Sequence, residues 1–298
     1  MRKGSISVET ENIFPIIKQF LYSDQEIFLR ELIANATDAT SKLLTLARRG
    51  EVDQEVNDTR IRVSIDADAK TLTISDRGIG MTEEEVLKYL NQVAFSSATE
   101  FVEKYKEEAS IIGHFGLGFY SAFMVADKVD VITKSYKKDS VPVKWSCTGD
   151  PEYTLEEVEK ADYGTDIVLH ISEDSAEFLQ NFRISELLNK HCKFLPIEIE
   201  FGTRTEETEE TITKEDGTEE KKTIEVPNVI NNPNPAWKKQ PAELSDEEYR
   251  SFYSELLPSG EPPMFWVHLN IDYPFNLTGI LYFPKISEKM EVQKDKIQ

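Results

Sequence analysis

Apolar side chains recur every three or four residues between Gln25 and Arg49, in a segment that contains neither glycine nor proline. This spacing is typical of an amphipathic helix. The segment ends in two arginines followed by Gly50, which is a typical helix end. The pattern therefore predicts one long helix near the start of the chain. Shorter helices are predicted at 81–91, 119–125 and 184–194.

Alternating apolar and polar residues predict strands elsewhere in the first 200 residues. The segments 61–65 and 71–75 flank a turn at 68–70 and are predicted to form a hairpin. Further strands are predicted at 129–133, 141–145 and 166–170. Because strands often follow one another directly, we expect an α/β (α+β) two-layer sandwich whose mixed, largely antiparallel sheet carries helices on one face.

An acidic segment separates this region from the rest of the chain. Residues 203–228 hold nine acidic and four basic side chains around a turn signal at Asp216-Gly217. They form either a solvated hairpin or a flexible charged linker, and we favour a linker with a marginal hairpin. The apolar region that follows is short for a domain. The expected domains are therefore 1–205, a linker at 206–228, and the beginning of a second domain at 229–298.

Charge and cysteine usage narrow the classes of function and compartment. The 298 residues carry a formal charge of −21, which argues against a surface for nucleic acid. Cys147 and Cys192 lie far apart and no apolar signal follows the basic start, so a reducing cytoplasm is expected. The uncharged stretch 109–126 is interrupted by glycines, and we expect no contact with a membrane.

One face of the long predicted helix carries a polar stripe. Glu31, Asn35, Asp38 and Lys42 are spaced by three or four residues and share that face. Taken alone, such a stripe is more often an ordinary solvated face, because charged stripes are common on helices. The functional alternative is a carboxylate that orients a water molecule as general base, one turn from an amide oxygen that ligates Mg²⁺.

A second motif, Asp76-Arg-Gly-Ile-Gly-Met81, directly follows a predicted strand. An aspartate at a strand end can accept a hydrogen bond from a ligand amino group, and the two glycines let the backbone approach closely. The alternative is a tight turn in which Asp76 caps the next helix. Thr82 and Glu85 already form a capping-box pattern there, so Asp76 is not needed as the cap.

A third motif is the glycine-rich segment Gly113-His-Phe-Gly-Leu-Gly-Phe119. Its spacing is the reverse of the dinucleotide-binding fingerprint and no clear strand precedes it, which argues against that fold. Glycines ahead of a predicted helix can instead present backbone amides to phosphate groups. Each motif is weak alone, but the three together, in this order, are much more specific.

These three motifs, with Gly164-Thr-Asp-Ile-Val-Leu169, resemble the ninety-kilodalton heat-shock chaperone family in its bacterial form. The resemblance continues beyond the acidic segment, at 234–237 and 246–253, and so covers nearly the whole chain. It implies a gyrase, histidine-kinase and MutL type of ATPase fold, followed by the start of the family's middle domain.

The resemblance also implies roles for individual residues. Glu31 would be the general base, Asn35 would hold Mg²⁺ against the phosphates of ATP or ADP, and Asp76 would accept a hydrogen bond from the adenine amino group. The other residues implied to line the nucleotide are Asp38, Lys42, Gly80, Met81, Gly113, Gly116, Gly118, Phe119 and Thr165.

The implied function is that of an ATP-dependent chaperone of the heat-shock and stress response. A lid at about 92–111 would close over ATP, and client proteins would be unfolded or partly folded. The full-length protein would be a homodimer, and this chain a monomer. The family's middle domain supplies a catalytic arginine beyond the position that matches Gln298, so we expect this chain to bind ATP with little hydrolysis.

Three positions differ from the family's usual pattern. The lid start at 94–99 is one residue longer and lacks a lysine, Arg77 stands in place of a small polar residue, and His114 stands in place of a glutamine.

Two other classes of function remain. A DNA-remodelling ATPase of the gyrase or MutL kind would share the fold, but the first domain is acidic. A non-enzymatic adaptor would not need to retain both Glu31 and Asn35.

Overall fold

The computed structural model describes residues 24–91, 101, 112, 117–213, 219–272 and 277–285. The chain divides into two compact units, Met1–Pro233 and Asn234–Gln298. Each unit has its own sheet, and each is described separately below.

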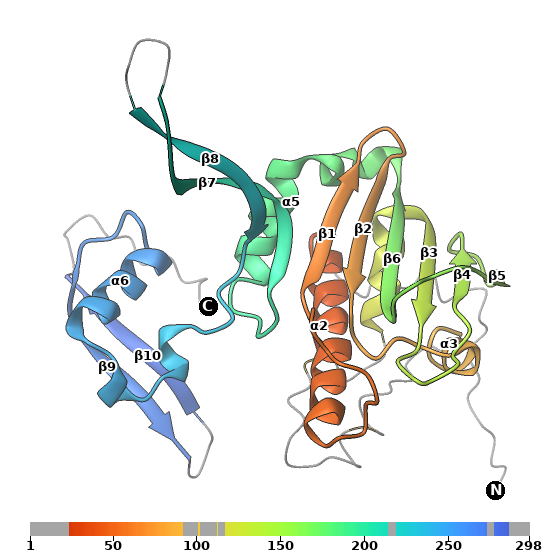
Figure 1. The fold of residues 1–298 in the computed structure, drawn as a ribbon, viewed down its shortest axis with the longest axis horizontal. Helices are drawn as coiled ribbons and strands as arrows, with labels where there is room; N and C mark the ends of the chain where they lie inside the picture. The colour runs from red at the N-terminus through yellow and green to blue at the C-terminus, as the bar shows by residue number, and fades with distance from the viewer. Residues whose placement is uncertain are drawn as a thin grey trace, which may run out of the picture. The chain divides into compact units, whose positions relative to one another are not determined.

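The first unit is built on an eight-stranded sheet (Figure 1). Its strands lie in the order β5-β4-β3-β6-β2-β1-β7-β8, and all neighbours are antiparallel except β1 and β7, which are parallel. The expected mixed, largely antiparallel sheet is confirmed. The strand bounds are β1 Ile61–Asp66, β2 Thr71–Asp76, β3 Ala126–Lys134, β4 Val143–Cys147, β5 Tyr153–Glu157, β6 Gly164–Ile171, β7 Ile199–Thr213 and β8 Glu219–Val229.

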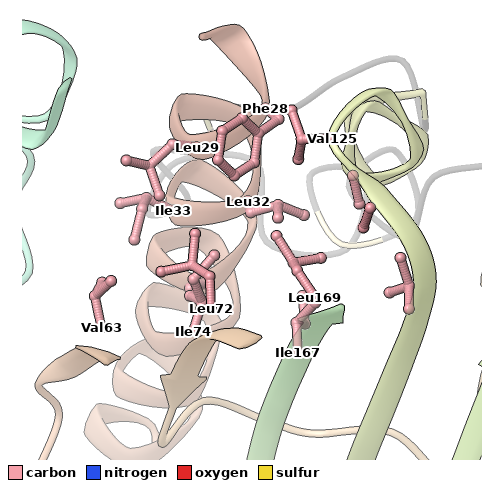
Figure 2. Close-up of a cluster of buried hydrophobic side chains, with 14 of the residues drawn as sticks. Phe28, Leu29, Leu32, Ile33, Val63, Leu72, Ile74, Val125, Ile167 and Leu169 are labelled. Carbon is pink, nitrogen blue, oxygen red and sulfur yellow. The ribbon is translucent and has the colours of Figure 1, made fainter. Parts of the chain in front are cut away.

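One face of this sheet packs against helices, of which α2 is the longest. Helix α2 runs from Ile27 to Arg48 and places its apolar stripe against β2 and β1. Figure 2 shows side chains from this stripe pointing toward apolar residues of β2 and β6. Completely buried members of this core include Phe28, Leu32, Ile33, Leu72 and Leu169. The other helical segments of the unit are α3 Glu83–Tyr89, η3 Gly118–Met124, η4 Glu173–Leu179 and α5 Asn181–His191.

Local sequence signals account well for the ends of two of these helices. Helix α2 begins and ends within two residues of the predicted bounds. At α3 the Thr82 side chain accepts a hydrogen bond from the Glu85 amide and the Glu85 carboxylate accepts one from the Thr82 amide. The predicted capping box is confirmed, so α3 needs no cap from Asp76.

Two predictions of secondary structure need correction. The segment predicted as a helix at 119–125 is a 3₁₀-helix, η3, that begins at Gly118. Helix α5 begins three residues earlier than predicted, at Asn181. Strand β5 was not predicted, because its residues are mostly exposed and lack the alternating pattern of a half-buried strand.

The acidic segment forms two paired β-strands and is not an unpaired linker. Strands β7 and β8 form an antiparallel hairpin in which Thr213 pairs with Glu219 and Ile212 with Glu220. Since β7 also pairs with β1 through Ile199, this hairpin continues the sheet of the first unit. Of the two alternatives that the sequence left open for this segment, the structure has the hairpin.

The second unit is a two-stranded sheet packed against one helix. It contains α6 Asp246–Leu256, β9 Pro263–Ile271 and β10 Leu277–Pro284, with short 3₁₀ turns at Ala236–Lys238 and Pro241–Glu243. Aromatic contacts hold it together: Tyr249 stacks on Trp266 at 5.1 Å between centroids, and Trp237 meets Phe252 edge to face. Both tryptophans therefore take part in packing within this unit.

Among the described residues, no helix has the length and apolar character needed to cross a membrane.

Candidate functional site

Helix α2 presents Glu31 toward the beginning of η3. Glu31 is about one-fifth exposed, and its Oε1 accepts a hydrogen bond from the Arg30 Nη2 at 2.6 Å. The other oxygen, Oε2, lies 2.6 Å from the point that a β-carbon at position 118 would occupy. A glycine is therefore required at 118 for this carboxylate to keep its place. The structure brings together two predicted site residues, Glu31 and Gly118.

The rest of the polar stripe becomes more buried along α2. Asn35 is half-buried one turn after Glu31, whereas Asp38 and Lys42 are buried. Asp38 Oδ1 accepts a hydrogen bond from the Ile112 amide at 2.9 Å, and the Lys42 ammonium lies 5.6 Å from the Phe101 ring centroid. Burial lowers the pKa of Lys42, and the Asp38 charge partly offsets that effect. An ordinary solvated face does not describe these residues.

Asp76 ends β2 on the helix-covered face of the sheet and is only 6% exposed. Its Oδ1 accepts a hydrogen bond from the Gly78 amide at 2.8 Å, and the Thr165 amide also donates to the carboxylate. Burial raises the pKa of Asp76 to about 7, against the lowering effect of these amides. A carboxylate held this way keeps acceptor capacity for one more donor.

The glycines after Asp76 allow two elements to approach the turn. A β-carbon at Gly78 would lie 2.5 Å from the carbonyl carbon of Ala39 on α2. Gly80 has a φ of +56°, and a β-carbon there would lie 1.9 Å from the Lys134 carbonyl oxygen on β3. The Ile79 amide donates to the Ala39 carbonyl at 3.1 Å. The turn is thereby fixed between α2 and β3.

Two threonines line the same end of the sheet. The Met81 amide donates to Thr133 Oγ1 at 2.9 Å, and Thr133 Oγ1 lies 2.9 Å from Thr165 Oγ1. Both threonines are buried. Three predicted residues, Asp76, Met81 and Thr165, are therefore close in space.

Sequence reasoning missed Thr133 as a member of this group. Thr133 lies on the core-facing side of β3, together with Val129 and Val131. A polar side chain at a core-facing position is the signal that marks it, because a buried hydroxyl needs a partner.

The Phe119 side chain packs against aromatic residues, although the glycines before it suggest a residue that lines a ligand. Its ring packs edge to face against Trp145 at 5.7 Å and against Tyr120 at 5.6 Å between centroids. The side chain thus belongs to the margin of the core.

Several predicted site residues lie outside the described residues. These are Gly113 and Gly116 of the glycine-rich motif, and all of the predicted lid at 92–111 except Phe101. Within the described parts of the chain, no group of three or more histidine, cysteine, aspartate or glutamate side chains is arranged to hold a metal ion.

Comparison of the sequence with known protein families agrees with this architecture. The family model for histidine kinase-, DNA gyrase B- and HSP90-like ATPases matches residues 22–169, which contain α2, Asp76 and η3. The fold and its sheet therefore place the first unit in this class of ATPase. The family model for Hsp90 protein matches residues 203–298. The chain belongs to the Hsp90 family.

Individual relatives support the same conclusion. The chaperone protein HtpG of Porphyromonas gingivalis is 58% identical over 300 residues, which cover 100% of this chain and 42% of the relative. HtpG of Bacteroides thetaiotaomicron is 58% identical over 299 residues, with the same coverage. HtpG of Psychromonas ingrahamii is 38% identical over 288 residues, covering 94% of this chain and 45% of the relative. The chain thus spans less than half the length of these relatives.

Proposed function

We propose that this chain is the nucleotide-binding part of an ATP-dependent molecular chaperone. It would bind ATP and ADP with Mg²⁺ in the first unit and hydrolyse ATP slowly. Family membership supports nucleotide binding, and the shared name of the relatives, chaperone protein HtpG, supports the chaperone function.

The observation that carries the proposal is that α2 relates two carboxylates: Glu31 is on the helix itself, and the turn that follows Asp76 contacts the helix farther along. The Asp76 turn contacts the helix at Ala39, and Glu31 lies eight residues earlier. Eight residues correspond to about 12 Å along a helix axis. An extended nucleoside triphosphate spans a separation of this size. The adenine would lie at Asp76 and the terminal phosphate near Glu31.

At the adenine end, the buried Asp76 carboxylate would accept a hydrogen bond from the exocyclic amino group. Met81 is half-buried against the core and would cover one side of the base. Gly80 and Thr165 would line the edge. Since the carboxylate is already oriented by two backbone amides, little reorganisation would accompany binding.

At the phosphate end, Glu31 would orient and deprotonate the attacking water. A positioned general base contributes roughly 10²- to 10⁴-fold to a rate. The Gly118 backbone lies beside this carboxylate. Gly113 and Gly116 would add backbone amides to the same phosphate-binding loop, and Phe119 would add its own backbone. Asp38 and Lys42 would lie farther along the helix, beside the segment that contains Ile112.

The amide oxygen of Asn35 is the proposed protein ligand for Mg²⁺. A single neutral oxygen fits this cation, which keeps several water or phosphate ligands when it binds with a nucleotide. The bound cation would neutralise phosphate charge in a chain whose formal charge is −21. Asn35 would orient it from one turn beyond the general base.

The remaining parts of the proposal concern the whole protein. Unfolded or partly folded proteins would be its clients, its location would be cytoplasmic, and the longer protein would be a homodimer. The 298-residue chain alone would be a monomer with little turnover.

Calorimetric titration of the chain with ADP and ATP, with Mg²⁺ and with a chelator, tests the proposal. We expect binding of both nucleotides and weaker binding of ATP without Mg²⁺. Under single-turnover conditions Glu31→Ala should abolish the slow hydrolysis and leave affinity within about threefold, because the base acts on water and not on binding. Loss of ATP binding in Glu31→Ala would contradict this assignment.

A DNA-remodelling ATPase is not favoured. Such a protein would show turnover that rises when duplex DNA is added, whereas we expect no change, because a strongly acidic surface repels phosphate backbones.

A further inference from the structure

An ion pair lies behind the adenine end of the proposed site, on the opposite face of the sheet. Asp76 pairs with Thr165 across β2 and β6, so the next residue on β6, Asp166, pairs with Ser75. Successive side chains on a strand point to opposite faces. Asp166 therefore lies on the outer face, one position from the partner of Asp76.

Lys160 supplies the cation of this pair. Its Nζ donates to Asp166 Oδ2, and its side chain is only 13% exposed, against 29% for Asp166. Its own backbone is held as well, because Lys134 Nζ on β3 donates to the carbonyls of Lys160 at 3.3 Å and Ala161 at 2.9 Å. The loop between β5 and β6 is thus held by contacts with β3 and β6.

Both members of the pair act on the charge of Asp76. The Asp166 charge raises the pKa of Asp76 and the Lys160 charge lowers it, each by a smaller amount than burial does. Lys160, paired with Asp166 through Asp166 Oδ2, therefore opposes the repulsion that Asp166 exerts on the Asp76 carboxylate. The other charged groups on elements packed around Asp76 are Arg77 on its own turn, paired with Asp162, Lys134 on β3, and Asp38 and Lys42 on α2.

We propose that Lys160 is a positioning residue for nucleotide binding: through its ion pair with Asp166 it keeps the Asp76 carboxylate ionised and ready to accept the adenine amino group. This inference rests on the proposed function of Asp76. It predicts that the two members of the pair have opposite effects on adenine nucleotide affinity. A merely structural ion pair predicts the same direction for both.

The test uses the full 298-residue chain and calorimetric titration with ADP between pH 5.5 and 8.5. Lys160→Met and Asp166→Asn are compared with the unaltered chain at each pH, and the ratio of affinities cancels the titration of the ADP phosphates. Lys144→Met is the matched control. Lys144 also lies on the outer face and approaches Asp130 and Glu156, but its strand, β4, is separated from β2 by two strands.

We expect Lys160→Met to weaken ADP binding roughly threefold near pH 7, because an uncompensated Asp166 disfavours the ionised Asp76. Asp166→Asn should strengthen binding by a similar factor between pH 6 and 7. Both ratios should return toward one near pH 8.5, where Asp76 is ionised in all variants, and Lys144→Met should stay near one throughout.

Effects in the same direction, or ratios that do not change with pH, would overturn the inference. If Lys160→Met fails to fold, Asp166→Asn alone decides between strengthened and weakened binding. Absence of ADP binding by the unaltered chain would instead remove the proposed function, so the two failures are distinguishable.

Discussion

The Oε2 atom of Glu31 lies 2.6 Å from the point that a β-carbon at Gly118 would occupy. A real β-carbon does not tolerate an oxygen at that distance, so one of the two groups would have to move. Any side chain at 118 would therefore displace the proposed general base. This relationship joins the polar stripe on α2, through Glu31, to the glycine-rich segment, through Gly118.

Gly118→Ala is expected to reduce single-turnover ATP hydrolysis more than tenfold, because a misplaced base loses much of its roughly 10²- to 10⁴-fold contribution. ADP affinity should change much less, since the proposed adenine site is at Asp76 and not at Gly118. Rapid-quench measurement of hydrolysis and calorimetry of ADP separate the two effects. Gly279→Ala is the control, because nothing lies within 4 Å of the corresponding β-carbon. An unchanged hydrolysis rate in Gly118→Ala would show that Glu31 is not the base in this position.

Gly80→Ala should destabilise the first unit severely. It combines a positive φ with a β-carbon 1.9 Å from the Lys134 carbonyl oxygen. We expect a loss of more than about 2 kcal/mol in the free energy of unfolding, measured with urea. Gly50→Ala has a similar φ of +72° with nothing within 4 Å, so it isolates the cost of the backbone conformation. Equal losses in the two variants would show that the close approach to β3 adds nothing.

Glu26 should make folding sensitive to acid. Hydrogen bonds from Lys190 and Arg183 on α5 hold the pKa of Glu26 at about 2, below its ordinary value of 4.5. A carboxylate with a depressed pKa in the folded state stabilises folding above pH 4.5, and this contribution is lost as pH falls toward 2.

Glu26→Gln is therefore expected to lower stability at pH 7 by roughly 1 to 3 kcal/mol. The difference from the unaltered chain should shrink as pH falls from 5 to 3, in thermal unfolding followed by circular dichroism. Glu51→Gln, in the exposed pair with Arg49, should cost less than about 1 kcal/mol. A difference for Glu26→Gln that stays constant across this pH range would contradict the role of its charge.

Much of the fold could be predicted from local patterns. Helix α2, the β1–β2 hairpin and the Thr82 cap each depend on residues close in sequence, and the structure confirms them. Strand β5 could not be predicted, and for the acidic hairpin the sequence left a flexible linker open as the alternative. Both consist mainly of polar residues, and their strands form because β4 and β1 offer edges for pairing.

In the candidate site, too, features set by residues close in sequence could be predicted, whereas contacts between separate elements could not. The spacing of the polar stripe on α2 indicated which of its side chains share a face. No spacing in the sequence could show that Thr133 contacts Thr165, or that Lys160 approaches Asp166 behind Asp76. These contacts join residues from separate elements, which only the sheet register brings together.

The central claim is that Asp76 binds the adenine of a nucleotide, and calorimetry of ADP binding to Asp76→Asn tests it most directly. The substituted amide keeps the size of the side chain but replaces one acceptor oxygen with a donor, which faces the adenine amino group unfavourably. The account predicts that ADP affinity falls by roughly tenfold to a hundredfold, because a buried polar group left unpaired costs about 1 to 3 kcal/mol. Affinity within about threefold of the unaltered chain, in a variant with native circular dichroism, would contradict it.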